Sequence, residues 1–353
     1  MQGDSARPAA RTLCDPAGNT RQDRAPCSPV GPPRSADSAI ALFAPAGIGE
    51  VTPGSDLVAL IAEAIGTDPH GPLRPGDIVV VTSKIISKAE NRYADAADRE
   101  AAITAESRRV VAQRGTLRIV RTRTGLTIAA AGVDNSNVEQ GRILLLPLDP
   151  DASAERLAAG LSAVAGGDVG VIVSDTAGRA WRLGQTDHAI GAARVRVLES
   201  YAGQIDGYGN ALAVTTMALA DELAAAADLV KSKLADRPVA VIRGRSDLVV
   251  TRREDDPRDD PSSPGEALAA SAIVRDGPGD LFSHGSREAV LAALCEALGV
   301  PEAYQELVGA DPQRVAAELL RSGGLPGDAA ELVHALLQAA TQLGGPTQRR
   351  PQA

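Results

Sequence analysis

The sequence predicts a fold that mixes β-strands with α-helices and ends in a run of short helices. Three apolar, β-branched runs are typical of buried strands: Ile78 to Thr82, Val169 to Val173 and Pro238 to Ile242. Apolar residues three or four apart predict amphipathic helices over 56–65 and about 217–234. Glycines divide residues 302–340 into what we expect to be three further short helices.

Composition narrows the classes of function. The 353 residues carry a formal net charge of −9, which argues against nucleic acid or an acidic membrane as a partner. The three cysteines are far apart and match no metal spacing, which fits a reducing compartment; we expect a cytoplasmic protein. The N-terminus has no apolar segment of a secretory signal, and no apolar run reaches the ~20 residues of a membrane span.

The chain divides into four predicted parts. Residues 1–38 and 343–353 are polar and without periodicity, and we expect disordered tails. Residues 39–285 hold the strands and the candidate site, and residues 286–342 form a helical extension. Within the main part, the pattern predicts a strand over 40–44, a helix over 98–113, strands over 117–122, 143–146 and 194–199, and a helix from a cap at Asp151 or Ser153 to Leu161.

The first candidate site follows the strand that ends at Val173. Asp175 and Thr176 come next, then Gly178 and the arginines Arg179 and Arg182. Oxygen ligands suit a hard cation, and forked guanidinium groups suit a phosphate or a carboxylate. The alternative is a tight turn with a surface salt bridge.

Two further strand ends carry polar groups. Ser83, Lys84 and Lys88 follow the strand 78–82 and suit phosphates, although a solvated lysine pair is an equal alternative. Asp134 and Asn137 lie in a run of four polar residues and suit a cation and a nucleotide, although an Asx turn explains them as well.

Other glycine-bearing turns are weaker signals. The turn at 45–51 brings backbone N–H groups near a ligand, and the strand 238–242 ends in Arg243-Gly244-Arg245. Lys231 and Lys233 fall in the last turn of a predicted helix, where the helix dipole accounts for them. No Walker A motif, Rossmann glycine motif, paired helical histidines or serine-hydrolase elbow is present in the sequence.

Five motifs together resemble one family, the coenzyme F420:L-glutamate ligases. They span about residues 40–285 in order: Gly47-Ile-Gly-Glu50, Val81-Thr-Ser-Lys-Ile-Ile-Ser-Lys-Ala-Glu90, Ala131-Gly-Val-Asp-Asn-Ser-Asn137, Ser174-Asp-Thr-Ala-Gly-Arg-Ala-Trp-Arg-Leu-Gly-Gln-Thr-Asp187 and Asp228-Leu-Val-Lys-Ser-Lys233. The resemblance implies an α+β fold of mixed sheets with flanking helices, and a homodimer.

The resemblance also implies an activity. A GTP-dependent ligase would add L-glutamate, and further γ-linked glutamates in some cases, to the phospholactyl carboxylate of the coenzyme F420 precursor through an acyl phosphate. Two Mg²⁺ or Mn²⁺ ions and K⁺ would assist. Some relatives carry a flavin-binding nitroreductase domain as well; residues 286–353 are too few and too helical for it, so we expect that activity to be missing.

The resemblance assigns roles residue by residue. Asp134 and Asp175 would bind one metal ion and Thr176 a second. The nucleotide contacts would be Ile48, Gly49, Glu50, Val51, Ser83, Lys88, Asn137 and Gly244. The loop after Gly244 departs from the family pattern, and Asp247 is the candidate for its metal ligand. Our catalytic candidates are Asp175, with Arg179 and Arg182 as cations for the anionic substrates.

Two alternatives stay open at this point. One is a related nucleotide-dependent amide ligase that acts on another carboxylate and amine. The other is a non-catalytic subunit that binds a nucleotide, or binds a partner through its helical C-terminal part.

Overall fold

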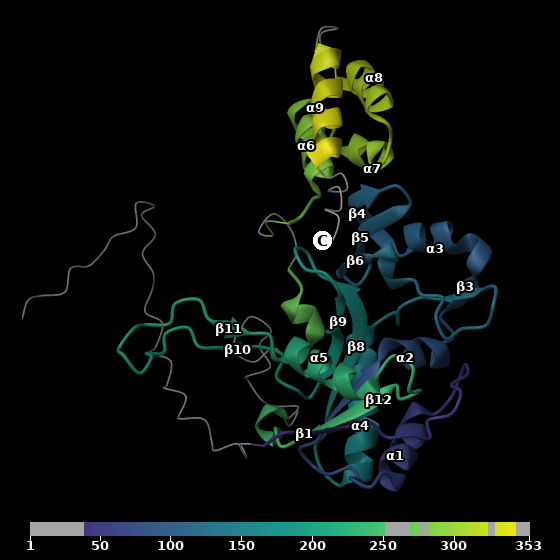
Figure 1. The fold of residues 1–353 in the computed structure, drawn as a ribbon, viewed down its shortest axis with the longest axis vertical. Coiled ribbons are helices and arrows are strands. Elements are labelled where there is room, and N and C mark those ends of the chain that lie inside the picture. Colours follow the sequence, from purple (N-terminus) through teal and green to yellow (C-terminus); the bar gives the residue numbers. More distant parts are fainter. Residues whose placement is uncertain (1–38, 251–268, 276–279, 281, 324–328, 344–353) are drawn as a thin grey trace, which may run out of the picture. The chain divides into compact units, whose positions relative to one another are not determined.

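The computed structural model describes residues 39–250, 269–275, 280, 282–323 and 329–343 (Figure 1). Contacts divide the chain into residues 1–35 and 36–353, and every element below belongs to the second unit. The predicted tails therefore lie outside the described residues, apart from Leu343, which ends the last helix.

The central element is a five-stranded sheet. Its order is β1 (Ala41–Phe43), β12 (Val239–Arg243), β2 (Ile78–Thr82), β8 (Gly170–Gly178) and β9 (Gln185–Ala193). The strands β2 and β8 are parallel, and the other neighbours are antiparallel. The parallel pairing places Thr82, the last residue of β2, opposite Ser174, from which β8 continues to Gly178 beside β9.

Helices cover both faces of this sheet, which explains why the runs 78–81, 171–173 and 239–242 are continuously apolar. On one face, α1 (Leu57–Thr67) and α4 (Pro150–Ala165) pack their apolar residues against Val79, Val81, Val171 and Val173. On the other face, α5 (Leu219–Lys231) packs against Ile78, Val80 and Ile172 (Figure 1). The site below lies at the edge of this layered core.

Capping groups set the helix starts. The Asp56 carboxylate accepts a hydrogen bond from the backbone N–H of Ala59 and caps α1. The predicted caps of α4 were wrong. Asp149 caps that helix, with its side chain accepting from Ala152 N, and Pro150 occupies the first helical position, which proline suits.

Smaller sheets complete the main part. They pair β4 (Ser107–Arg114), β5 (Leu117–Thr122) and β6 (Thr127–Ala129); β3 (Tyr93–Asp95) with β7 (Arg142–Leu144); and β10 (Glu199–Ser200) with β11 (Thr216–Met217). The other helices are α2 (Ser83–Ala89) and α3 (Arg99–Ala105), with short 3₁₀ turns at Ala96–Asp98, Ala130–Gly132, Ser246–Leu248 and Ala270–Ile273.

Two predictions of secondary structure were wrong. The expected helix over 98–113 ends as α3 at Ala105, and the rest becomes β4, because pairing with β5 places Val110 opposite Val120. Of the strand expected over 194–199, only Glu199 enters a strand, although Val195 and Val197 are fully buried. In both cases contacts distant in sequence overrode the local pattern.

The C-terminal part is helical, as predicted. It consists of α6 (Ser286–Ala297), a 3₁₀ turn at Pro301–Ala303, α7 (Tyr304–Leu307), α8 (Pro312–Gly323) and α9 (Ala329–Leu343). Leu291, Leu319 and Leu337 belong to an apolar cluster that is separate from the clusters of the sheet. The whole is an α+β fold, and none of the described helices is both long and apolar enough to cross a membrane.

Candidate functional site

The carboxyl end of β2 and the part of β8 beside it bring two of the predicted segments together. Ser83 begins α2 directly after β2, and Asp175 follows Ser174 on β8. The Ser83 hydroxyl donates to the Asp175 carboxylate, with 2.8 Å between Oγ and Oδ1. The register of the two strands therefore joins residues that are 92 positions apart in sequence.

The third predicted segment reaches the same place. Asp134 pairs with Leu144 in an isolated bridge, and its Oδ2 lies 2.8 Å from Nζ of Lys84. Lys84 also donates to Ser136, at 2.9 Å to the carbonyl oxygen and 2.6 Å to Oγ. The alternative of an Asx turn is present as well, because the Asp134 carboxylate accepts from the backbone N–H of Ser136 at 2.8 Å.

A cavity of about 820 Å³ is lined by Lys84, Asp134, Ser136 and Asp175. Its wall includes most of the predicted site residues: Ile48, Gly49, Glu50, Val51, Lys88, Asp134, Asn137, Asp175 and Thr176. Arg99, Leu117 and Ile128 line it as well. Lys88 is buried and lies 2.5 Å from the Glu50 carboxylate, so a lysine of α2 closes onto the 47–51 turn.

The carboxyl groups of Asp175 and Asp134 differ in pKa. Burial raises the pKa of Asp175 to about 6, and the negative charges of Asp187 and Asp134 add to this, against the Ser83 hydrogen bond. Burial also opposes the charged form of Asp134, but the hydrogen bonds and charge of Lys84, with Ser136, outweigh it and lower the pKa. Asp175 is thus the carboxylate whose charge is least compensated, which favours a cation beside it.

A buried ion pair lies next to Asp175. Nζ of Lys231, on α5, is 2.7 Å from Oδ2 of Asp187, on β9, and the side chains are 5% and 4% exposed. Ser174 and Thr176 donate to the two oxygens of Asp187, at 2.8 and 2.7 Å. Burial opposes the charge of Asp187, but Lys231 and the two hydroxyls more than offset it and lower the pKa of that carboxyl.

Sequence reasoning missed this pair. Lys231 was explained by the helix dipole, yet it is four residues after the buried Ala227 and so falls on the buried stripe of α5. A lysine on an apolar stripe requires a buried partner, and that was the available signal. The helix was also predicted to extend to about Leu234, which lies beyond the end of α5 and is 90% exposed.

Four predicted residues do not line the cavity. One is Ser83, which is linked to it through its hydrogen bond to Asp175. Arg179 and Arg182 lie between β8 and β9, where Arg182 is exposed and Arg179 donates to the Leu183 carbonyl oxygen at 3.4 Å. Gly244 follows β12 at the opposite end of the sheet, since Ile242 pairs with Ile78 at the start of β2. Its φ of +104° and the nearby Ala39 carbonyl oxygen give a conformational reason for the glycine.

Asp247 does not reach the cavity either. Its carboxylate forms a two-bond pair with Arg245, at 2.9 and 3.0 Å. The roles proposed for Arg179, Arg182, Gly244 and Asp247 stay predictions, since the described chain alone does not bring these residues to the carboxylates.

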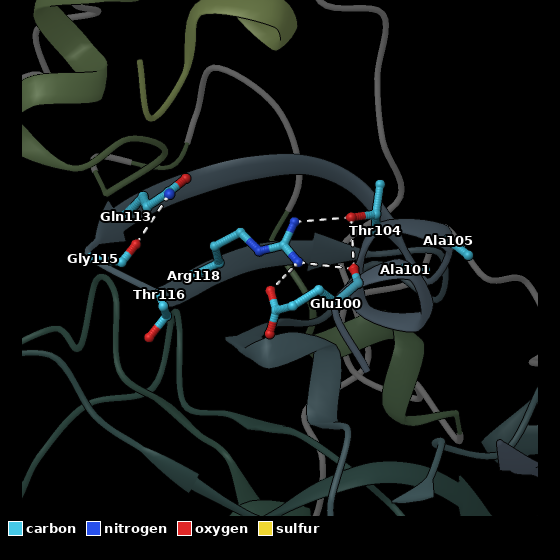
Figure 2. Close-up of a pocket in the computed structure, with 8 residues that line it drawn as sticks. All are labelled: Glu100, Ala101, Thr104, Ala105, Gln113, Gly115, Thr116 and Arg118. Carbon is cyan, nitrogen blue, oxygen red and sulfur yellow. Dashed lines mark hydrogen bonds and ion pairs between the residues drawn. The ribbon is translucent and has the colours of Figure 1, made fainter. Parts of the chain in front are cut away.

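A second hollow of about 760 Å³ lies over α3 and β5 (Figure 2). Arg118 lines this hollow. Its guanidinium group donates to the Glu100 carboxylate at 2.9 Å, to the Glu100 carbonyl oxygen at 3.1 Å and to the Thr104 hydroxyl at 3.0 Å. Because these partners hold the guanidinium, the hollow offers an anion little free charge, and the first cavity remains the candidate site.

The donor set of the first cavity suits a hard divalent cation. Asp134, Asp175 and Thr176 offer two carboxylates and a hydroxyl, and Mg²⁺ typically uses one or two carboxylates with phosphate oxygens completing its shell. Among the described residues, no group of three or more His, Cys, Asp or Glu side chains is arranged to hold a metal ion. Two carboxylates and a hydroxyl leave positions around such a cation open to the oxygens of a phosphate-bearing substrate, an arrangement that suits phosphoryl transfer.

Comparisons with known proteins identify one family. The model of the F420-0:gamma-glutamyl ligase family matches residues 47–244. The coenzyme F420:L-glutamate ligase of Methanosarcina acetivorans is 37% identical over 210 residues, covering 54% of this chain and 80% of that protein. The ligase of the same name from Archaeoglobus fulgidus is 35% identical over 225 residues, covering 58% and 88%.

A relative in Halobacterium salinarum strain R1, also named coenzyme F420:L-glutamate ligase, is 38% identical over 226 residues, covering 57% of this chain and 85% of its own length. The chain therefore belongs to the F420-0:gamma-glutamyl ligase family, and it is an enzyme of the ligase class. The matched range contains β2, β8 and every residue of the cavity discussed above.

Proposed function

We propose that this chain joins L-glutamate to the phospholactyl carboxylate of the coenzyme F420 precursor, with GTP as the co-substrate. The observation that carries the proposal is the meeting of Asp134, Asp175 and Lys84 in one cavity. Named relatives of the same family, which this chain covers over most of their length, supply the substrate class.

The chemistry needs no nucleophile from the protein. The substrate carboxylate attacks the γ-phosphorus of GTP, forming an acyl phosphate and releasing GDP. The glutamate amine then attacks the acyl carbon, the amide bond forms, and phosphate leaves as the amine loses a proton. Transfers of this kind depend on positioning and on offsetting negative charge, which agrees with a site of Asp, Thr, Ser and Lys residues.

We assign the positions as follows. The 48–51 turn, Ser83, Lys88 and Asn137 face the nucleotide, and Lys84 moves from Asp134 to a phosphate oxygen as the substrates bind. Divalent cations, Mg²⁺ or Mn²⁺, held by Asp134, Asp175 and Thr176 would offset the charge that develops on the transferred phosphoryl group. We propose K⁺ as a further cofactor of the enzyme.

The proposal includes a homodimer. Trp181 and Leu183, between β8 and β9, are 89% and 99% exposed, and Tyr208, between β10 and β11, is 96% exposed. Large apolar side chains exposed at such hairpins suit a surface that a partner covers. The same dimer would place Arg179 and Arg182 beside another copy, where they can bind an anionic substrate. We place the reaction in the cytoplasm.

A mass-spectrometric assay tests the proposal. Purified protein is incubated with the deazaflavin precursor, L-glutamate, GTP and Mn²⁺, and the product is examined for a gain of one glutamyl residue, or of more if further γ-linked glutamates are added. Parallel reactions replace GTP by ATP and the wild type by Asp175→Asn. We expect the gain with GTP and wild-type protein only.

The alternatives give different results in the same assay. A gain only with another carboxylate acceptor or amine would indicate a related amide ligase. Nucleotide binding without phosphate release for any acceptor would indicate a non-catalytic subunit. Either result would overturn the proposed substrates.

A further inference from the structure

We propose that the buried pair of Asp187 and Lys231 is a positioning device, which turns the lone pairs of the Thr176 hydroxyl toward the cavity. This inference rests on the proposed function, because it concerns how Thr176 meets a cation. Asp187 and Lys231 also line the cavity. Their charged atoms are bound to each other and to the hydroxyls of Ser174 and Thr176, so we assign them an action through Thr176 and no contact with the substrates.

The pair is deeply buried. Lys231 and Asp187 are 4% and 3% exposed, and Ser174 is fully buried between them. Lys231 comes from α5, Asp187 from β9, and Ser174 and Thr176 from β8, so three elements meet at this network. A buried ion pair adds little to stability compared with an apolar pair of similar size, so stability alone is a weak reason for its presence.

The directions of the hydrogen bonds follow from the donor count. The Lys231 ammonium only donates, to Ser174 Oγ at 2.8 Å and to Asp187 Oδ2 at 2.7 Å. An ionised carboxylate only accepts, so the hydroxyls of Ser174 and Thr176 must both donate to Asp187. The single proton of Thr176 is therefore committed to Asp187 Oδ1.

As a consequence, the Thr176 hydroxyl can act only as an acceptor toward the cavity. Thr176 lines the cavity, and with its proton bound to Asp187 its oxygen can offer only lone pairs there. Lone pairs suit a cation and do not suit a phosphate oxygen. Because Lys231 and Asp187 cancel in net charge, they fix this orientation without adding charge to the cavity.

The variant Asp187→Asn reverses the orientation. Lys231 cannot face an amide NH₂ group, so the amide oxygen must occupy the Oδ2 position and the NH₂ group the Oδ1 position. The NH₂ group then donates to Thr176, and the proton of Thr176 turns toward the cavity. In the double variant Asp187→Asn with Lys231→Met, the amide is free to turn over, and Thr176 again donates its proton to it.

The test counts Mn²⁺ ions bound to the full chain with GTP, by electron paramagnetic resonance. Thr176→Val identifies the ion that depends on this hydroxyl. We expect Asp187→Asn to raise the Kd of that ion at least tenfold while the other ion is retained, and the double variant to recover most of the affinity. The matched control is Asp77→Asn, in the other buried ion pair of the sheet.

Several results would overturn the inference. They are an unchanged Kd in Asp187→Asn, an equal loss of both ions, a double variant no better than the single one, and a wild type that binds no second ion. Failure of the proposed function looks different. If wild-type protein binds two ions but adds no glutamate in the mass assay, the substrates are wrong and the role of Asp187 and Lys231 stands.

Discussion

Two buried ion pairs lie at opposite ends of the central sheet. Lys231 and Asp187 lie where β8 approaches its carboxyl end, and Arg243 and Asp77 lie where β2 begins. The separations are alike, at 2.7 and 2.8 Å, and Asp187 and Asp77 are similarly buried.

The remaining hydrogen bonds distinguish the pairs. Arg243 also donates to the backbone carbonyl oxygens of His70 and Pro72, and Asp77 accepts from Arg74 N, so that pair ties a loop to the sheet. Lys231 and Asp187 instead bind two hydroxyl groups, one of which faces the cavity. The two pairs have similarly buried aspartates and similar separations, so these quantities do not distinguish their roles. The further hydrogen-bond partners of each pair do.

The largest effect is expected at the cavity end, from Asp175→Asn. Removing this carboxylate should lower kcat/KM for glutamate addition at least roughly a hundredfold, because a metal ion stabilises transferred charge by several kcal/mol. The mass assay under saturating Mn²⁺ measures the loss. Near wild-type turnover would show that Asp175 does not hold the cation.

The same variant should stabilise the metal-free fold. The pKa of Asp175 is raised to about 6 from 3.8, so the folded protein binds this proton more tightly and loses stability as pH rises between these values. Asp175→Asn should therefore raise the free energy of unfolding near pH 8 by on the order of 3 kcal/mol, with no gain below about pH 4.

Asp134→Asn is a control for that measurement, because it should change the free energy of unfolding in the opposite direction. The lowered pKa of Asp134 means that its charged form stabilises the fold above its unfolded pKa, and that this contribution is lost as pH falls. Denaturant unfolding should show Asp134→Asn less stable than wild type near pH 8. If both variants shift in the same direction, the assigned electrostatics are wrong.

The next effect concerns Lys231→Met. It leaves Asp187 buried without its cation and should lower the free energy of unfolding by about 3–5 kcal/mol. Adding Asp187→Leu should restore much of this loss, since an apolar pair replaces the charges. Urea unfolding of the three proteins tests the point, and a double variant as unstable as the single one would contradict it.

The pH dependence of Mn²⁺ binding should follow Asp175. Because its pKa is about 6 without metal, protons compete with the cation below that value, and the apparent Kd should rise about tenfold for each pH unit. Isothermal titration across pH 5 to 8 should show this rise at the acid end and little change above about pH 7. A flat profile would exclude Asp175 as the titrating ligand.

At the other end of the sheet, Arg243→Met should affect stability alone. The Asp77 carboxylate loses its cation but keeps the bond from Arg74 N, so we expect a loss of about 1–3 kcal/mol. Ligation measured on the folded fraction should stay within about twofold of wild type, since the pair lies away from the cavity. If Arg243→Met lost much of its kcat but kept normal stability, the Arg243–Asp77 pair would also act on the reaction, and the two ion pairs would not differ in role.

The smallest effect is expected at the second hollow. Arg118→Met removes a guanidinium whose main partner, the Glu100 side chain, is 60% exposed, and exposed pairs contribute about 0–1 kcal/mol. Thermal unfolding and the mass assay should both stay near wild type. A clear loss of ligation would mean that the hollow over α3 and β5 takes part in the reaction (Figure 2).

Much of the site could be predicted because its signals are local. Ser83, Asp134 and Asp175 each follow an apolar strand or a small-residue turn, and the parallel pairing of β2 and β8 brings two of them into contact. The strands 78–82 and 117–122 were confirmed at both ends, since both combine β-branched residues with clear turn signals.

The remaining features depend on contacts distant in sequence. Nothing near Asp187 in sequence shows that a lysine 44 residues away meets it, and the arginine-rich stretch 107–114 becomes a strand only because β5 pairs with it. Likewise, the position of Gly244 at the far end of the sheet follows from β12 running antiparallel to β2, which a single sequence does not encode locally.

The central claim is that Asp134 and Asp175 act on one cation, and a double-mutant cycle tests it most directly. Ligation rates are measured for wild type, Asp134→Asn, Asp175→Asn and the double variant under saturating Mn²⁺ and GTP. If the two carboxylates hold the same ion, the double variant should lose little more activity than the more damaging single variant. Losses that multiply across the two positions would show that the carboxylates act independently, and the shared site would be excluded.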